Sequence, residues 1–303
     1  MDIYLPIAGQ SVNALFIVVL GFVVGLLSGM FGVGGGFLTT PLLIFYGIPP
    51  TVAVASAATQ ITGASVSGVM VHMRRGGVDL KMGGVMIVGG LAGSIVGAAL
   101  FRMLQTSGQI DVVIGSLYVL ILGSIGFVML KDALIALGYV GSAPAADRPP
   151  RHNRWVASLP MRWRFYSSGL YISPLAPFAL GFIAGILTVL LGIGGGFILV
   201  PAMIYLLGMA ARVVIGTSLV MILAVSASTT MVHALTTGAV DIVLAALLLV
   251  GGVIGAQYGA LLAARTKPDL LRLALAVIIL IVALRMLLGL TWRPDEIFSI
   301  ELL

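Results

Sequence analysis

Long apolar segments that recur along the whole chain limit its fold more than any other feature. Only 9% of the residues are charged, against 60% that are hydrophobic. Eight apolar segments have the length that a helix needs to cross a bilayer, roughly 17 to 25 residues: 12–31, 50–73, 82–104, 110–130, 174–191, 213–235, 241–264 and 269–290. The sequence therefore predicts an all-α polytopic membrane protein.

Two further apolar segments, 36–48 and 196–208, are too short to cross a bilayer alone. A helix of this length reaches about 19 Å, whereas the hydrocarbon core is about 30 Å thick. Each short segment overlaps the end of a glycine-rich stretch, GVGGG at 32–36 and GIGGG at 192–196. We expect each stretch to turn the chain back inside the membrane, so that a long helix, a glycine turn and a short helix form a hairpin.

The two glycine-rich stretches belong to an internal repeat. Residues 21–41 and 181–201 share ten identities in 21 positions, and the match continues to Asp79 with Asp241 and to 89–100 with 251–262. A repeat of this length means that one structural unit occurs twice. We divide the chain into a first transmembrane repeat (1–130), a basic connector (131–172) and a second transmembrane repeat (173–303).

The positions of Lys and Arg indicate how the repeats are oriented, because cytoplasmic connectors are enriched in these residues. If each repeat crosses the membrane an odd number of times, the 16 Lys and Arg divide thirteen to three between the two sides; an even number divides them eleven to five. The odd number predicts two inverted-topology repeats, each with a hairpin and three transmembrane helices. Both termini then lie outside and the connector in the cytoplasm. Parallel repeats stay open as an alternative.

The glycine turns have the chemistry of a binding site. Non-helical backbone inside a membrane is tolerated only where it is buried in protein or lines a wet cavity. Glycine permits positive φ and lets a ligand approach the backbone closely. Phe37 and Phe197 then start short helices, whose first N–H groups are unpaired and whose dipoles are positive at this end. Two such turns predict a site for a small anion that needs no Lys or Arg.

Glycine also has a purely structural use in membrane helices, where small residues four apart let two helices pack closely. The three successive glycines of each turn do not have this spacing, so we favour binding for them. Six other glycines do have it and predict helix packing: Gly89, Gly93, Gly97, Gly251, Gly255 and Gly259.

The paired motifs resemble a known family. GxGGGFLxxPLL after a glycine-bearing helix, its repeat GxGGGFIxxPAM, and VIGTSL at 214–219 are similar to the TauE/SafE sulfite exporter family, also called the toluene sulfonate uptake permeases. The resemblance covers roughly 21–104 and 181–262. It implies a secondary transporter that moves sulfite, sulfoacetate or another sulfur-containing anion across the bacterial inner membrane, with periplasmic termini. It also implies that the glycine turns line the substrate site: Gly34, Gly35, Gly36, Gly194, Gly195 and Gly196.

Polar side chains within the apolar segments are further candidates for substrate binding. They are concentrated in the first repeat, since Val220 and Met221 occupy the positions that match Thr59 and Gln60. The alternative is that such side chains bond to helix carbonyls or to neighbouring helices. With the phenylalanines that start the short helices, the candidates are Phe37, Thr39, Ser56, Thr59, Gln60, Phe197, Thr217 and Ser218.

Two histidines, His72 and His233, occupy matched positions near opposite faces of the membrane in the inverted arrangement. Histidine exchanges protons near neutral pH, so both are candidates for proton coupling. Placement at the membrane interface explains them as well. No carboxylate lies in the middle of an apolar segment, which leaves the coupling ion open.

Other functions have little support in the sequence. Without any cysteine the chain forms neither disulfides nor a thiolate metal site, and nothing indicates a metal or a cofactor. It has no GxxxxGK[ST] loop for an ATP-driven pump, and Ser65 with His233 resembles an intramembrane protease only faintly, so we expect no enzyme. An anion channel, or a permease for an anion without sulfur, is the open alternative. The expected partners are a small anion and membrane lipids, with no nucleic acid; a homodimer is left open.

Overall fold

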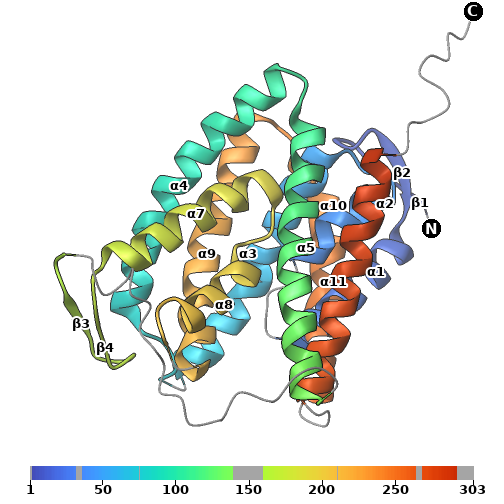
Figure 1. Ribbon diagram of the computed structural model, residues 1–303. Helices are drawn as coiled ribbons and strands as arrows, with labels where there is room; N and C mark the ends of the chain where they lie inside the picture. The colour runs from blue at the N-terminus through green and yellow to red at the C-terminus, as the bar shows by residue number, and fades with distance from the viewer. Residues whose placement is uncertain are drawn as a thin grey trace, which may run out of the picture.

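The computed structural model describes residues 2–31, 36–74, 76–138, 160–209, 211–263 and 268–291, and it is predominantly helical (Figure 1). The first half begins with a hairpin of two strands, β1 (Asp2–Leu5) and β2 (Gln10–Asn13). Five helices follow: α1 (Ala14–Phe31), the short α2 (Gly36–Phe45), α3 (Pro50–Arg74), α4 (Leu80–Thr106) and α5 (Ile110–Ala136).

The second half has the same order of elements. It begins with a hairpin of β3 (Trp163–Phe165) and β4 (Leu170–Ile172). Five helices follow again: α7 (Leu175–Leu191), the short α8 (Gly196–Tyr205), α9 (Ala211–Thr236), α10 (Ile242–Ala263) and α11 (Pro268–Thr291). The internal repeat of the sequence is therefore also a repeat of secondary structure.

Each predicted apolar segment corresponds to one helix. In the described ranges, six helices are long and apolar enough to cross a membrane: α3, α4, α5, α9, α10 and α11. The other two predicted spans, 12–31 and 174–191, correspond to α1 and α7, which are apolar but shorter than this criterion requires. An α-helix suits these segments because it satisfies its own backbone hydrogen bonds where no water is present. The predicted short helices are confirmed, since α2 and α8 have ten residues each and contain Pro41 and Pro201.

Two crossings between the halves bring helix backbones into direct contact. Helix α1 packs on α10, and α7 packs on α4 in the corresponding way. A Cβ atom added to Gly25 would clash with the carbonyl oxygen of Gly252, and one added to Gly185 would clash with that of Gly90. The packing role of the six spaced glycines is confirmed, because each lies in one of these crossings, against the backbone of the partner helix. Such close approach strengthens helix association in lipid.

Helices that match in the repeat also pack on each other, in antiparallel pairs. Thr59 of α3 lies beside Thr230 of α9, with hydroxyl oxygens 3.3 Å apart, and Gly68 lies against Leu219. Residue numbers therefore rise along one helix while they fall along the other. Helices α5 and α11 form a second such pair and stand side by side in Figure 1.

The sequence analysis did not predict the two β-hairpins. Each is antiparallel and precedes the first helix of its half, and the two lie at opposite corners of the helical body (Figure 1). They are fastened by buried apolar side chains, Leu5 and Val12 in one and Phe165 and Ile172 in the other. Strands of three or four residues are too short to leave a clear alternating pattern in a sequence. The second hairpin falls inside the predicted connector, and α5 continues past residue 130 into it.

Candidate functional site

The glycine turn of the second half has the backbone geometry that the sequence predicts. All residues of 192–196 are buried, and Gly195 is the N-cap of α8. Three glycines have φ values in the left-handed region that disfavours other residues: Gly192 at 67°, Gly194 at 73° and Gly195 at 75°. In the first half, Gly34 and Gly35 lie outside the described residues.

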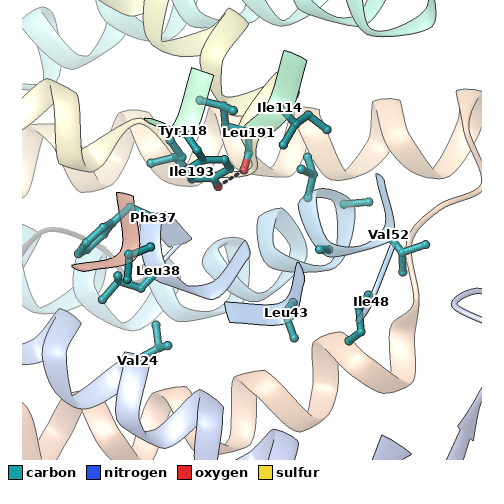
Figure 2. Packing of buried hydrophobic residues seen from close by; sticks show 14 of the residues in the cluster. Val24, Phe37, Leu38, Leu43, Ile48, Val52, Ile114, Tyr118, Leu191 and Ile193 are labelled. Carbon is teal, nitrogen blue, oxygen red and sulfur yellow. Dashed lines mark hydrogen bonds between the residues drawn. The ribbon is translucent and has the colours of Figure 1, made fainter. Parts of the chain in front are cut away.

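Two hydrogen bonds hold the C-terminal end of α7, directly before the glycine turn. The Tyr118 hydroxyl of α5 donates a hydrogen bond to the carbonyl oxygen of Leu191 at 2.5 Å (Figure 2). The N–H of Gly192 donates to the carbonyl oxygen of Thr188 at 2.8 Å. Carbonyl groups that the helix leaves unpaired therefore have partners, as buried backbone requires.

The two short helices begin next to each other. A Cβ atom on Gly36, the first residue of α2, would lie 2.9 Å from the carbonyl oxygens of both Gly192 and Ile193. The rings of Phe37 and Phe197 stack with centroids 4.6 Å apart and an angle of 11° between their planes. Both rings are buried. The N-termini of α2 and α8, far apart in the sequence, are thus brought together inside the protein.

A cavity of about 180 Å³ lies beside this meeting point, between α1, α3, α9 and α10. Its wall includes Ile61, whose side chain is also the nearest neighbour that a Cβ atom would meet at Gly36 and at Gly194. Ile61 therefore separates the cavity from the glycine turn of the second half. The lining in the described chain contains no Lys, Arg, Asp or Glu, and its polar side chains are Ser28, Gln60, Ser65 and His72.

Two predicted residues, Thr39 and Gln60, form one hydrogen-bonded group at this cavity. The Thr39 hydroxyl donates to Gln60 Oε1 at 3.1 Å, and Gln60 Nε2 donates to the carbonyl oxygen of Leu248 at 3.4 Å. The amide is therefore oriented by α2 on one side and α10 on the other. Its nitrogen carries two hydrogens, and the bond to Leu248 uses one of them.

Ser56 and Thr217, which match in the repeat, make the same contact in each half and do not line the 180 Å³ cavity. Ser56 Oγ accepts a hydrogen bond from the N–H of Asp241 at 3.2 Å. Thr217 Oγ1 accepts one from the N–H of Asp79 at 3.0 Å. In this structure the two hydroxyls hold the chain before α10 and α4.

Thr59 and Ser218 also bond within the protein. The Thr59 hydroxyl donates to the carbonyl oxygen of Ala55 at 3.0 Å, and Ser218 Oγ donates to that of Ile215 at 3.0 Å. Neither side chain lines the cavity. These bonds to the preceding helical turn are the pattern that the sequence leaves open as an alternative to substrate binding.

The matched histidines have different surroundings. His72 lines the cavity, and its Nδ1 lies 3.0 Å from the carbonyl oxygen of Gly68. His233 is fully buried away from it, with Nε2 3.0 Å from the carbonyl oxygen of Val189 and its ring edge-on to Phe101 at 4.7 Å. The structure thus places one of the two candidates for proton coupling at the cavity.

Asp79 has a structural role that the sequence did not reveal. One carboxylate oxygen, Oδ1, accepts from the N–H of Met82 at 3.0 Å and caps α4. The other, Oδ2, accepts from the N–H of Ser168 at 3.0 Å and from the Ser168 hydroxyl. Ser168 lies in the turn of the β3–β4 hairpin. A residue of the first half therefore holds the hairpin of the second.

Asp241 repeats this arrangement in the opposite direction. Its Oδ1 accepts from the N–H of Leu244 at 3.1 Å, and its Oδ2 accepts from the N–H of Ile7, in the turn of the β1–β2 hairpin, at 3.2 Å. We call Asp79 and Asp241, with their hairpin partners, the aspartate clamps. Both carboxylates are almost fully buried, and hydrogen bonds to N–H donors offset the loss of water around them.

Ser28 and Ser65 complete the cavity, although the sequence analysis does not assign them to substrate binding. Ser65 and His72 are seven residues apart on α3, so they share one face of the helix. This spacing is a signal in the sequence that would have found Ser65. Ser28 lies on α1 directly before Gly29, which also lines the cavity, and no comparable spacing points to it.

Comparison with known proteins decides the family. The sequence model of the sulfite exporter TauE/SafE family matches residues 17–286, a range that contains both short helices, the cavity and both clamp aspartates. The chain belongs to the sulfite exporter TauE/SafE family. The resemblance drawn from the paired glycine motifs is therefore confirmed, and with it a membrane transporter as the general class of function.

Members of the TauE/SafE family with similar sequences come from bacteria and plants. The probable membrane transporter protein YjnA of Bacillus subtilis (strain 168) is 30% identical over 271 residues, which cover 89% of this chain and 98% of YjnA. The probable membrane transporter protein YunE of the same organism is 25% identical over 285 residues, covering 89% and 96%. Sulfite exporter TauE/SafE family protein 6 of Arabidopsis thaliana is 46% identical over only 52 residues, 17% of this chain and 12% of the plant protein. No solved structure matches this chain.

Proposed function

We propose that this TauE/SafE protein is a secondary transporter for a small sulfur-containing anion, namely sulfite, sulfoacetate or another organosulfonate. The observation that carries the proposal is the 180 Å³ cavity, whose largely apolar wall contains four polar side chains and which lies beside the point where the two short helices begin. The family name supports sulfite or a related anion as the substrate. A cell inner membrane is the proposed location.

The cavity is suited to holding an anion loosely. The hydroxyls of Ser28 and Ser65 and the amide of Gln60 donate hydrogen bonds without carrying a charge. A hydrogen bond to a charged partner contributes about 1.5 to 3 kcal/mol, so a few of them suffice for recognition. A transported ion also has to leave, and a site without Lys or Arg does not trap it. His72 is the ionisable group on the described wall and is our candidate for the residue that carries a coupled proton.

The glycine turns add unpaired backbone N–H groups at the positive ends of α2 and α8. In this structure the side chain of Ile61 lies between the cavity and the turn at 192–196. We propose that Ile61 moves aside during the transport cycle, so that the anion reaches the N–H groups of the second turn. The predicted substrate contacts at Gly34 and Gly35 lie outside the described residues and stay part of this proposal.

We further propose that the two halves are inverted repeats in the membrane, with periplasmic termini and a cytoplasmic connector. Three observations support this arrangement. Matching helices form antiparallel pairs, the two hairpins lie at opposite corners of the molecule, and the uneven division of Lys and Arg favours an odd number of crossings in each half. Inverted halves would give the cavity access to each side in turn.

The test is transport by the purified protein in proteoliposomes. Uptake of labelled sulfite, sulfoacetate and a carboxylate of similar size is measured, together with counterflow from preloaded vesicles. We expect saturable uptake and counterflow of sulfite or a sulfonate, with the carboxylate transported more slowly. Flux without saturation or counterflow would mean an anion channel, and transport of cations alone would contradict the proposal.

Two glycine variants test whether the turn at 192–196 binds substrate or only needs glycine for its backbone conformation. Gly195→Ala places a side chain at a φ of 75° in the turn, and Gly238→Ala does so at a φ of 61° in a connector where a Cβ atom meets nothing within 4 Å. The backbone strain of roughly 1 to 2 kcal/mol is similar in both. We expect Gly195→Ala alone to lose most of its uptake. Equal uptake by the two folded variants would mean that the turn is structural.

A further inference from the structure

A second cavity, with no lining residue in common with the first, lies at the ends of α2, α5 and α11. It has a volume of about 260 Å³. Its walls combine apolar side chains with one cation and one carboxylate, Arg285 of α11 and Asp111 of α5. Its apolar lining includes Ile44, Phe45, Met286 and Leu290. Nothing in the proposed transport mechanism uses this cavity.

Arg285 occupies an unusual position for a charged residue. It lies in a helix that is long and apolar enough to cross a membrane, six residues before the end at Thr291, or about 9 Å along the axis. Its guanidinium carbon lies 5.3 Å from the centre of the Phe45 ring. Within the described part of the chain, no carboxylate forms an ion pair with it. A cation near the hydrocarbon region needs a polar partner, because leaving it unpaired costs a few kcal/mol.

Asp111 lines the same cavity without pairing with Arg285. It is exposed in the first turn of α5, where a negative charge also favours the helix dipole. Opposite charges at two points of one cavity, separated by an apolar wall, match a zwitterion that carries both charges. The surrounding helices expose apolar side chains, among them Val112 at 62% and Leu288 at 46%, as expected of surfaces that face lipid.

We propose that this cavity binds the headgroup of a phospholipid of the phosphatidylethanolamine type. The guanidinium of Arg285 holds the phosphate, for which its planar array of donors is well suited. The carboxylate of Asp111 accepts hydrogen bonds from the ammonium group. The apolar wall formed by Ile44, Phe45 and Leu290 contacts the glycerol and the start of an acyl chain.

At the corresponding corner of the second half, the described residues differ from those that line this cavity. Tyr205 occupies the position that matches Phe45, and its hydroxyl lies 3.5 Å from Asp132 Oδ2. A tyrosine beside a carboxylate does not attract a phosphate. We therefore assign the lipid site to the corner that contains Arg285 and Asp111.

The test is lipid binding to the purified, delipidated full-length protein, measured by native mass spectrometry. The probes are phosphatidylethanolamine, phosphatidylcholine and phosphatidylglycerol with identical acyl chains. We expect Arg285→Gln to weaken phosphatidylethanolamine binding about tenfold, as for the loss of one charged hydrogen-bond pair. Asp111→Asn should remove the preference for phosphatidylethanolamine over phosphatidylglycerol. Arg102→Gln, at an exposed position of α4 outside both cavities, is the matched control and should leave binding unchanged.

Three results would overturn the proposal. The first is equal binding of all three lipids by the unchanged protein. The second is phosphatidylethanolamine binding that survives Arg285→Gln. The third is a loss of anion uptake in Arg285→Gln with lipid binding intact, which would place Arg285 on the path of the transported anion. Because lipid binding is measured without any substrate, failure of the transport proposal would leave this test unaffected.

Discussion

The two halves contain the same helices but fill the space beside the third helix of each half differently. In the first half, Gln60 lies against Gly252 of α10, where a Cβ atom would be 2.9 Å from its amide nitrogen. In the second half, the matching Met221 lies with Val225 against Gly90 of α4. One space is a cavity with four polar side chains in its wall, and the other is filled with buried apolar side chains. The helix packing is therefore repeated in the two halves, whereas the polar side chains of the proposed site all come from the first half.

Features that the halves share are those that fix the backbone. Both have a glycine-bearing helix crossing, a short helix whose second residue is a phenylalanine, and an aspartate clamp on the hairpin of the other half. Equal substitutions at such shared positions should lower stability in both halves. Substitutions at positions where the halves differ should affect transport in the first half and stability in the second. Four experiments test this division.

The largest effect is expected at the helix crossings. Gly25→Leu in α1 and Gly185→Leu in α7 each force a side chain into the backbone of the partner helix, where no side chain can move aside. We expect both to destabilise the protein by at least about 3 kcal/mol and to abolish the monodisperse peak in size-exclusion chromatography. Gly123→Leu, where a Cβ atom meets nothing within 4 Å, is the control. If only one crossing is sensitive, the two are not equivalent.

The next largest effect concerns the cavity itself. Gln60→Met gives the first half the residue of the second and removes an amide donor from the cavity wall. Uptake by the folded protein in proteoliposomes should fall about tenfold or more, and loss of the hydrogen bonds to Thr39 and Leu248 should lower stability by about 1 kcal/mol each. The reciprocal Met221→Gln buries a polar group among apolar neighbours, so it should lower stability by about 1 to 3 kcal/mol without changing the transport rate of the folded protein. Normal uptake by Gln60→Met would remove Gln60 from the site.

A smaller effect is expected at the aspartate clamps. Asparagine keeps the oxygen that caps the helix but replaces the second oxygen with an NH₂ group, which cannot accept from the hairpin. Asp79→Asn loses two donors of Ser168 and should cost about 2 kcal/mol, whereas Asp241→Asn loses one donor of Ile7 and should cost about 1 kcal/mol. Chemical denaturation in detergent measures both. The exposed Asp132→Asn serves as the control, and an equal cost in all three variants would show that the clamps do not stabilise the hairpins.

The smallest effect is expected at the histidines. His72 lines the cavity, so His72→Gln should change how uptake depends on pH. His233 bonds to the carbonyl oxygen of Val189 away from the cavity, so His233→Gln should leave the pH profile intact and lower stability by about 1 kcal/mol. Initial rates at a series of pH values decide this. A changed profile in His233→Gln alone would reverse the assignment.

The sequence is sufficient for the features that depend on local pattern. Segment length predicts six of the long helices but overestimates α1 and α7, and the short helices after the glycine turns follow from the same criterion. Glycine spacing predicts the crossings, since residues four apart in a helix share a face. The contact between Thr39 and Gln60 joins two residues that were both named as candidates, because both are polar residues in apolar surroundings.

The remaining features depend on contacts between distant residues. The clamp bond from Asp79 to Ser168 joins positions 89 residues apart, and that from Asp241 to Ile7 joins positions 234 apart. No local pattern reports such a pair, and the hairpins that they hold are too short to be recognised. Ser28 is equally hidden, since a serine in a membrane helix most often bonds to its own backbone, whereas Ser65 could have been found only through its spacing from His72. Their place at the cavity follows only from how four helices converge.

The two crossings between the halves also determine which groups of helices can move as rigid bodies. Because α1 packs closely on α10 and α7 on α4, each rigid group contains helices from both halves of the chain. If the chain were cut in its central connector, each fragment would lack the helix on which its first helix packs. We therefore expect each fragment to be insoluble when produced alone and to fold when the two are produced together. If an anion crosses the membrane by a rocking motion, the two bodies that rock would then not be the two sequence repeats, because each body would contain helices of both.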